Sequence, residues 1–218
     1  MAARRQFFNI DNLCIAILYF IPSGRVKAAL PPALSLSEVL PGVTMGGIYA
    51  ARFKKSDNEY VSELGIMRAY AACGDKKGFF VSEFFSDGKT GADAGRADFA
   101  WGFEMKNMTL SVSSGSELLI NLKMSPLLKQ VPFTSVLPFL CVKGENVSFM
   151  RNHLITKIGI SSSSVDIPEG SPLSNMPLGV KVLSTFWDSS NIITKEPEYA
   201  TKRAMKPADL RTPIGKST

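Results

Sequence analysis

The sequence predicts an α+β fold dominated by a mixed, mostly antiparallel β-sheet that is closed or nearly closed, with few and short helices. Segments rich in β-branched and aromatic residues recur along the chain, turn residues separate them, and no βαβ alternation is visible. The 218 residues, of which 45% are apolar, suffice for one domain with a sizeable core. We expect this domain to span residues 1–198 and residues 199–218 to form a flexible basic tail.

The first predicted elements are a strand, a short helix and a second strand. Cys14–Ile21 is apolar and rich in β-branched and aromatic residues, which predicts a buried strand. Ser23–Leu30 is expected to form a short helix, capped by Ser23 and terminated by the Pro-Pro pair that follows. Val43–Phe53 is predicted to be the next strand.

Two more strands and a helix are expected in the middle of the chain. Val61–Ala72 and Phe79–Phe85 are predicted to be strands joined by a hairpin-like turn. The second carries large apolar side chains on both faces, so we expect it to be buried on both sides. Ser86–Asp93, rich in Gly and Asp, predicts a loop, and Ala92–Ala100 a short helix that carries Arg96.

Five strands are predicted in the C-terminal half. Asn107–Val112 and Glu117–Met124 are expected to form a hairpin. The other three strands are expected at Leu137–Val142, Val147–Ile160 and Val180–Trp187. Three prolines are expected to break the segment after the hairpin: Pro126, Pro132 and Pro138. Ser161–Pro177, with four consecutive serines and three prolines, predicts a long loop.

The basic charge of the chain indicates a solvated surface and no nucleic-acid partner. The formal net charge is +6, and the basic residues are scattered along the sequence, most densely in the tail. A nucleic-acid-binding protein needs a basic face interleaved with exposed aromatic residues, or a known reader motif. Neither pattern is visible in this sequence.

Cysteine and histidine counts argue against metal and triad chemistry. Cys14, Cys73 and Cys141 lie far apart and show no C-x-x-C spacing, so neither a zinc site nor a disulfide framework is indicated. His153 is the single histidine, too few for a His-based metal site or a Ser-His-Asp triad. Dinucleotide and P-loop motifs are also missing from the sequence. We therefore expect neither a metal nor a cofactor.

The N-terminus resembles a signal peptide only superficially. A basic start, MAARR, precedes the apolar run LCIAILYFI, but Asn9, Asp11 and Asn12 interrupt the pattern. The run of about nine residues is also too short to span a bilayer. We expect a cytoplasmic protein with reduced thiols and no membrane association.

The segment Glu59–Lys106 carries the most specific pattern in the chain. A Tyr-x-x-Glu element at Tyr60–Glu63 is followed by a turn, a strand, Gly95-Arg96 and Trp101-Gly102. In this order and spacing the segment resembles the signature region of the acetoacetate decarboxylase superfamily. The resemblance extends upstream through Ala16–Leu36 and Pro41–Phe53, so that it covers about half of the chain. It implies a barrel-like fold with a ligand site inside.

The resemblance also implies a reactive lysine, which in that family forms an imine with a β-keto acid. Aligning the Trp-Gly pairs places Met105 at the reactive position and Lys106 at the second lysine. Aligning without a gap after Gly95-Arg96 places Phe103 and Glu104 there. Both alignments predict that the imine-forming lysine is missing, and membership in the family does not by itself imply decarboxylation.

Lys106 is the only lysine near the reactive position. On a strand it shares a face with Glu104, and a neighbouring carboxylate keeps an amine protonated, whereas an imine-forming lysine must be neutral. A solvated or salt-bridged Lys106 is the alternative to a catalytic one.

Glu63 and Arg96 are the other catalytic candidates, because they match the family's glutamate and arginine. A carboxyl in an apolar cavity has a raised pKa and can act as a general acid or base. Arg96 could hold a substrate carboxylate in its guanidinium fork. The alternative is that the two residues pair and brace the barrel. In either case we expect them to lie close together beside an internal cavity.

Substrate-binding residues are expected to form an adaptable, largely apolar lining. The candidates are Tyr49, Tyr60, Phe84, Trp101, Phe103, Glu104, Met105 and Met108. Plain core packing is the alternative for all of them.

These observations predict an enzyme that works without an imine on a small apolar or carbonyl-bearing metabolite of polyketide or isoprenoid type. It would be a lyase, isomerase or cyclase in which Glu63 is the acid or base and Arg96 the anchor. One alternative is decarboxylation of a β-keto acid through Lys106. The other is a non-catalytic carrier of an apolar ligand. Beyond the substrate, a homo-oligomer is a possible assembly.

Overall fold

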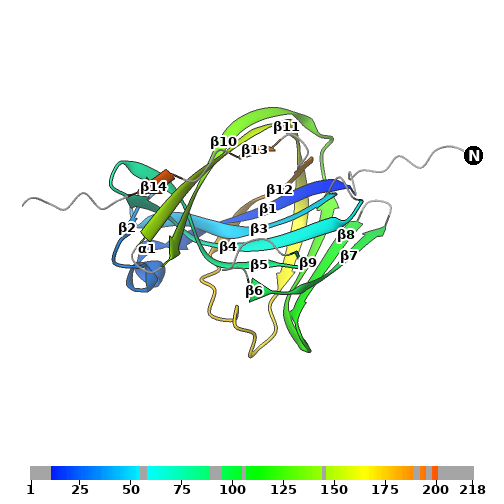
Figure 1. Cartoon of the computed structure of the whole chain (residues 1–218), viewed down its shortest axis with the longest axis horizontal. Helices are drawn as coiled ribbons and strands as arrows, with labels where there is room; N and C mark the ends of the chain where they lie inside the picture. Colours follow the sequence, from blue (N-terminus) through cyan, green and yellow to red (C-terminus); the bar gives the residue numbers. More distant parts are fainter. Residues whose placement is uncertain are drawn as a thin grey trace, which may run out of the picture.

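The computed structural model describes residues 11–54, 58–88, 95–104, 107–143, 146–188, 192–194 and 198–200. Apart from one short helix, α1 (Ser23–Val26), and a 3-10 turn, η1 (Lys27–Ala29), its elements are strands (Figure 1). The first half contains β1 (Asn12–Pro22), β2 (Ser35–Leu36), β3 (Val43–Lys54), β4 (Tyr60–Cys73), β5 (Lys76–Ser86), β6 (Gly95–Arg96) and β7 (Asp98–Glu104). The second half contains β8 (Asn107–Ser114), β9 (Glu117–Pro126), β10 (Val131–Lys143), β11 (Asn146–Asp166), β12 (Val180–Asp188), β13 (Ile192–Thr194) and β14 (Glu198–Ala200).

Seven of the strands close into a barrel. Their order is β10-β5-β4-β3-β1-β12-β11, and pairing between β10 and β11 completes the ring. All pairs in the ring are antiparallel except β5 with β10, which is parallel. The predicted fold class, a mixed and mostly antiparallel sheet closed into a barrel with few short helices, is confirmed.

The β10–β11 hairpin forms the roof of this barrel over a floor of β12, β1, β3, β4 and β5 (Figure 1). The floor strands pair along eight to eleven residues each. The roof meets the floor along two short seams, Phe139–Cys141 with β5 and Ile158–Ile160 with β12. Side chains that point inward from roof and floor therefore enclose a space between them.

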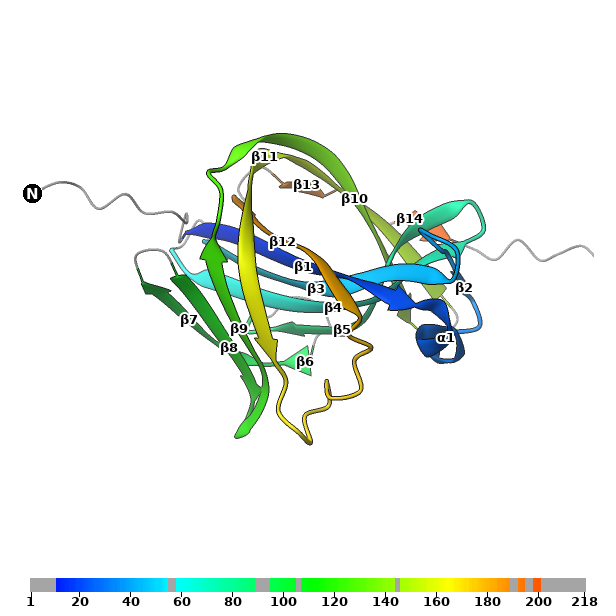
Figure 2. The ribbon, with the colours of Figure 1, turned by 180° about the vertical axis from the view of Figure 1, so that it is seen from behind.

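A second sheet, β7-β8-β9, packs on the outer face of the barrel. β11 joins it to the roof, because Ser161–Asp166 leaves the barrel and pairs with β9 (Figure 2). The main hydrophobic core lies between the second sheet and the floor and combines residues such as Ile17, Ile48 and Leu64 with Leu110 and Ile120. Burial of such side chains, at about 1.5–3 kcal/mol each, fixes the floor against this sheet.

Alternation along the floor strands decides which residues face the barrel interior. On β1, Ile15 and Ile17 belong to the main core, whereas Cys14 and Ala16 line the interior. β3 and β4 show the same alternation, with Ile48 and Ala50 of β3 and Leu64 and Ile66 of β4 in the core. Glu63 therefore faces inward because Leu64 is anchored in the core.

The predicted strands in the N-terminal half are confirmed as β1, β3, β4 and β5, with a two-residue turn at Gly74 and Asp75. β5 is buried on both faces over Phe79–Val81, as expected, and half-buried beyond. The predicted hairpin forms β8 and β9. The first helix is shorter than expected, and Pro22, not Ser23, precedes it without a side-chain cap.

The predicted helix over Ala92–Ala100 is wrong. Gly95–Arg96 forms β6, which pairs with β5, and Asp98–Glu104 forms β7, which pairs with β8. The physical signal is a period of two: the aromatic residues Phe99, Trp101 and Phe103 alternate with smaller or polar ones and pack against the core. Cross-strand pairing with β8 then outweighs the weak helix propensity of this segment.

Two further expectations about breaks in the chain are wrong. Pro132 and Pro138 lie within β10 rather than between strands. They are six residues apart and so point their missing N–H groups to the same edge of the strand, which is tolerated because β10 pairs with β5 only at Phe139–Cys141. The serines Ser161–Ser164 belong to β11, so the loop before β12 begins later than predicted.

The C-terminal segment runs back along the edge of β11. β13 pairs with Asn152–Leu154 and β14 with Val147–Phe149. Glu198, in β14, forms an ion pair with Lys76 at 2.8 Å. Residues 201–218 of the predicted tail lie outside the described residues. No helix within the described ranges is long and apolar enough to cross a membrane.

Candidate functional site

A cavity of about 490 Å³ lies inside the barrel, between roof and floor. Most of its wall is apolar and much of that aromatic, with Phe53, Phe79, Phe133 and Phe139 among the lining residues. Its polar lining groups come from Cys14, Tyr49, Glu63, Asn152, Thr185 and Trp187. This combination of an apolar wall and a few polar groups is typical of a small-molecule site.

Glu63 is the acidic residue among the described residues of the wall. Burial, followed by the negative charge of nearby Asp87, raises the pKa of Glu63 to about 7. Asp87 is fixed beside it, because its carboxylate accepts a hydrogen bond from the backbone N–H of Ser62 at 2.7 Å. Neither of the two ion pairs found among the described residues involves Glu63. The carboxyl is therefore poised to exchange a proton near neutral pH.

The cross-strand register places Glu63 at one end of a row of cavity residues. Trp187 pairs with Cys14, Cys14 with Ala51, and Ala51 with Glu63. All four line the cavity. The two small residues in the middle of the row leave open space between the carboxyl and the indole.

Tyr49 lies beside Glu63 with its ring flat over Gly65. A Cβ atom at Gly65 would lie 2.6 Å from Cζ of Tyr49, so only glycine leaves room for the ring. Phe139 and Phe84 flank the ring, with centroids 5.6 and 6.4 Å away. Burial, and then the charge of Glu63, hold the pKa of Tyr49 well above its usual range. The hydroxyl therefore stays protonated.

Replacing Gly65 with alanine is expected to push the Tyr49 ring off β4 and into the cavity, since a Cβ there has no free space. We expect binding of a neutral ketone such as cyclohexanone to weaken by at least about tenfold, equivalent to the loss of one good contact. The matched control is Gly24→Ala, because a Cβ at Gly24 meets nothing within 4 Å. Calorimetric titration measures both variants, and equal affinities would contradict this placement of the ring.

Cys14 also lines the cavity but is not poised as a nucleophile. Burial, and to a smaller extent the charge of Glu63, raise the pKa of the Cys14 thiol far above its usual range. A thiol is reactive as the thiolate, which this environment disfavours. Two other lining residues, Asn152 and Trp187, have a buried polar atom, Oδ1 and Nε1, without a hydrogen-bond partner among the described residues.

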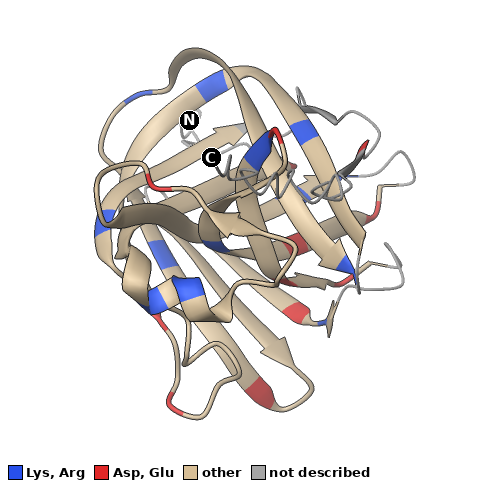
Figure 3. Cartoon of the chain, turned by 90° about the vertical axis from the view of Figure 1, so that its left-hand side faces the viewer, with Lys and Arg blue, Asp and Glu red and all other residues tan. Residues whose placement is uncertain are grey.

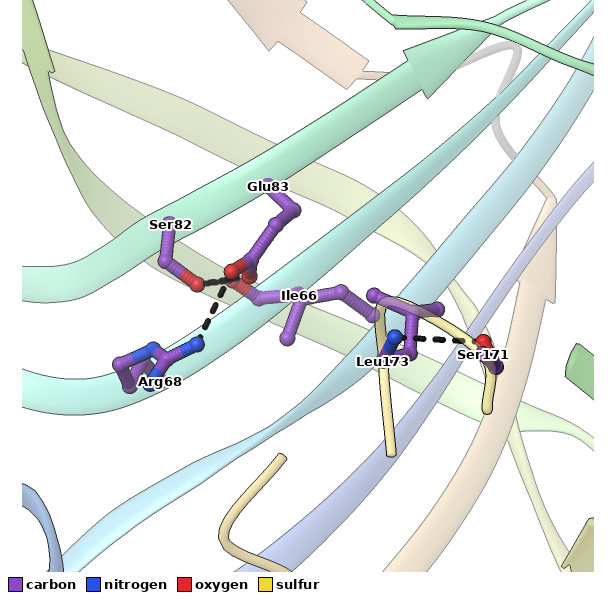
Figure 4. Close-up of polar contacts among 6 residues, drawn as sticks. All are labelled: Ile66, Arg68, Ser82, Glu83, Ser171 and Leu173. Carbon is purple, nitrogen blue, oxygen red and sulfur yellow. Dashed lines mark hydrogen bonds and ion pairs between the residues drawn. The ribbon is translucent and has the colours of Figure 1, made fainter. Parts of the chain in front are cut away.

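Arg96 does not lie where the family match predicted. Its side chain is exposed on β6 and does not line the cavity, so the expectation that Arg96 borders the cavity is wrong, whereas its expected closeness to Glu63 stays a prediction. The reason is that β6 adds to the open edge of β5 as a two-residue strand and remains at the surface. The arginine–carboxylate pair found near this part of the barrel is Arg68–Glu83, at 2.9 Å, with Ser82 also bonded to Glu83 (Figure 4).

Most of the other predicted binding residues lie outside the cavity. Tyr49 lines it. Trp101, Phe103 and Met108 pack in the core between the two sheets, and the Trp101 indole donates a hydrogen bond to Ser62 Oγ at 3.1 Å. Phe84 packs behind Tyr49, whereas Tyr60 and Glu104 are exposed. Met105 and Lys106 lie outside the described residues, so the expected absence of an imine-forming lysine stays a prediction.

Several lining residues were missed at the sequence level. Cys14 and Ala16 alternate with large β-branched residues on β1, and this small-large alternation is the one local signal that could have revealed them. Asn152, Thr185 and Trp187 come from β11 and β12, and no local pattern distinguishes them from core residues. Their place depends on the long-range closure of the barrel.

Metal-ligating side chains and surface charge bear on other kinds of site over the part of the chain that the structure describes. No group of three His, Cys, Asp or Glu side chains within the described ranges could hold a metal ion. Figure 3 shows basic segments spread over several elements and interspersed with acidic ones. On the face shown, the basic residues are thus dispersed among acidic ones and do not form one basic patch.

Comparison with known proteins identifies solved structures that share this fold. No protein-family model and no curated protein matches the chain. Among solved structures, acetoacetate decarboxylase from Legionella pneumophila is 15% identical and has a TM-score of 0.63, covering 89% of this chain and 86% of that chain. The enduracididine biosynthesis enzyme MppR complexed with pyruvate is 10% identical, with a TM-score of 0.62 and coverage of 88% and 89%. MppR complexed with the condensation product of pyruvate and imidazole 4-carboxaldehyde is also similar, at 10% identity, a TM-score of 0.61 and 88% coverage of each chain. The chain therefore has the acetoacetate decarboxylase fold.

Proposed function

We propose that the protein is an enzyme that binds a small, mostly apolar, carbonyl-bearing metabolite in the barrel cavity and transforms it by proton transfer through Glu63. The observation that carries this proposal is a single described carboxyl in a largely apolar wall, with a pKa of about 7. The reaction class is that of a lyase, isomerase or cyclase that needs neither an imine nor a cofactor, and we expect the enzyme to act in the cytoplasm.

The chemistry follows from the protonation state of Glu63. As a carboxylate it takes a proton from the carbon next to a carbonyl, the C–H electron pair forms a C=C bond, and the carbonyl π electrons move to oxygen as an enolate. The protonated Glu63 then returns the proton to the same or another atom, or the enolate expels a leaving group. A general acid or base whose pKa lies near the working pH accelerates such steps by about 10²–10⁴-fold.

The solved structures of the same fold support this class of substrate. One is an acetoacetate decarboxylase, and another enzyme was found with pyruvate and with a pyruvate condensation product. Carbonyl compounds are thus among the ligands of one enzyme of this fold. The largely apolar wall of this cavity favours a larger, less charged carbonyl compound, of polyketide or isoprenoid type.

The proposal is tested by exchange of the α-protons of cyclohexanone for deuterium, followed by NMR in D₂O. We expect the protein to catalyse the exchange in a saturable manner, because a neutral ketone places acidic C–H bonds beside Glu63. Saturable binding without exchange would instead identify a carrier of apolar ligands. No binding of cyclohexanone or of larger neutral ketones would refute the proposed substrate class.

Decarboxylation of a β-keto acid through Lys106 is the alternative that a trapping experiment decides. Treatment with acetoacetate and borohydride is expected to leave the intact mass unchanged, since both alignments place a residue other than lysine at the reactive position. A stoichiometric adduct in the wild type that disappears in Lys106→Ala would establish imine chemistry.

A further inference from the structure

The geometry points to Tyr49 as a second catalytic residue, whose hydroxyl donates a hydrogen bond to the substrate's carbonyl oxygen while Glu63 moves the proton at the adjacent carbon. This inference rests on the proposed function and names the group that receives the developing negative charge.

The small residues on either side of Tyr49 fix its position. In the cross-strand register Tyr49 lies between Ala16 on β1 and Gly65 on β4. Because the ring extends over Gly65, its Cζ atom, which carries the hydroxyl, lies directly above the β4 backbone. Phe139 approaches from the roof and Phe84 from β5, so the ring is held on two sides. A side chain fixed in this way is preorganised for one hydrogen bond.

The spacing of Gly65, which the Tyr49 ring covers, and Glu63 along β4 suits a carbonyl group. Gly65 and Glu63 are two residues apart on β4, so both positions face the interior and lie about 7 Å apart along the strand. A carbonyl oxygen and the neighbouring carbon, with one contact of about 3 Å at each end, span this separation. The charge of Glu63 raises the pKa of Tyr49, which is consistent with both groups facing the same cavity.

The hydrogen-bonding role is consistent with the protonation of the phenol. Burial and the nearby carboxyl both favour the neutral phenol, so the hydroxyl remains a donor throughout the physiological range. In the reaction, the proton passes from carbon to Glu63 and the electron pair ends on oxygen. Tyr49 stabilises that oxygen and does not itself need to lose its proton.

The wall holds other donors on Asn152, Thr185 and Trp187, and for Trp187 the position along the sheet argues against the role. Trp187 stands three strands from Glu63 in the row through Cys14 and Ala51. Neighbouring strands are about 4.8 Å apart, so the path along the sheet between the two backbone positions is about 14 Å, roughly twice the spacing between Glu63 and Gly65. The Trp187 Nε1 atom is also out of contact with solvent.

The decisive variant is Tyr49→Phe, which keeps the ring over Gly65 and removes only the hydroxyl. For α-proton exchange of cyclohexanone we expect kcat to fall by about 10²–10³-fold, as when one oxyanion donor is removed. KM should change less than about threefold, because the hydrogen bond strengthens only as charge develops. Tyr70→Phe is the matched control, since Tyr70 is half-buried and packs against Phe79 without lining the cavity. It should leave kcat unchanged.

Infrared spectroscopy of bound carbonyl-¹³C cyclohexanone gives a readout that does not depend on turnover. We expect a lower carbonyl stretching frequency in the wild type and in Tyr70→Phe than in Tyr49→Phe. If the wild type binds cyclohexanone without exchanging its protons, this shift still supports the Tyr49 contact, although the proposed reaction fails. Equal frequencies and equal kcat in wild type and Tyr49→Phe would overturn the inference, and so would failure of the wild type to bind the ketone.

Discussion

Glu63→Gln is expected to reduce turnover by at least about 10²-fold, because the amide keeps the size of the side chain but cannot accept and return a proton. The rate of cyclohexanone exchange, and later of the natural reaction, measures this loss. If the ionised form is the base, the wild-type rate should also rise with pH through about 7, the pKa of Glu63. An exposed glutamate on β9, Glu117, supplies the matched control in Glu117→Gln, which should retain full activity.

Glu63→Gln is also expected to be more stable than the wild type at pH 8. Because the pKa of Glu63 is raised from 4.5 to about 7 by folding, the folded chain holds a proton that the unfolded chain releases in this range. Stability from this group is complete below about pH 4.5 and is lost as the pH rises through about 7, a change of about 3 kcal/mol. Glutamine has no charge to desolvate, so Tm at pH 8 should rise by about 6–12 °C relative to the wild type.

Thermal unfolding at pH 4 and pH 8 separates this expectation from a bracing role. At pH 4 the wild type and Glu63→Gln should melt at similar temperatures, since the carboxyl is protonated in both states of the wild type. If Glu63 instead paired with a buried cation, its removal would cost about 3–5 kcal/mol and lower the Tm at pH 8. A variant that melts lower at pH 8 but keeps its activity would assign Glu63 to the scaffold.

The floor of the barrel could be predicted from sequence because its information is local. β1, β3, β4 and β5 each show a continuous apolar or alternating pattern bounded by prolines, glycines or polar turns. The Tyr-x-x-Glu motif identified Glu63, and the anchoring of Leu64 and Ile66 in the core explains why that carboxyl points inward. A carboxyl at an interior position of an otherwise apolar strand is a readable signal.

The rest of the site could not be predicted from the sequence. The prediction assumed that residues close together in the family motif all line the same cavity. Trp101, Phe103 and Met108 follow the family motif in the chain, yet they belong to the second sheet and pack against the outer face of the barrel floor, since β7 and β8 pair with each other and not with the barrel. Arg96 also lies at the surface and not in the cavity, because it is exposed on β6. The residues that complete the cavity come from the roof and β12, whose contacts with the floor are set by pairings far apart in sequence.

Phe186→Ala is expected to have the largest effect on stability. Phe186 is 1% exposed, belongs to the main core and covers Gly159 on β11. Gly159 and Phe186 pair in the short β11–β12 seam, which joins roof to floor. Gly159 has no side chain that could move into the vacated space, and the paired backbones cannot collapse, so a cavity remains where the ring was. Phe→Ala changes of this kind cost about 3–5 kcal/mol, and the upper half of that range is expected here.

For a domain of this size the loss corresponds to a decrease in Tm of about 8–20 °C. Denaturant unfolding monitored by tryptophan fluorescence measures it, and Leu127→Ala, at a residue that is 63% exposed, should change stability by less than about 0.5 kcal/mol. Trp187, the next residue, lines the cavity, so loosening this seam should also impair ketone binding at temperatures well below the melting point. A loss below about 1.5 kcal/mol would mean that the site can collapse, and that the seam is not a rigid joint between roof and floor.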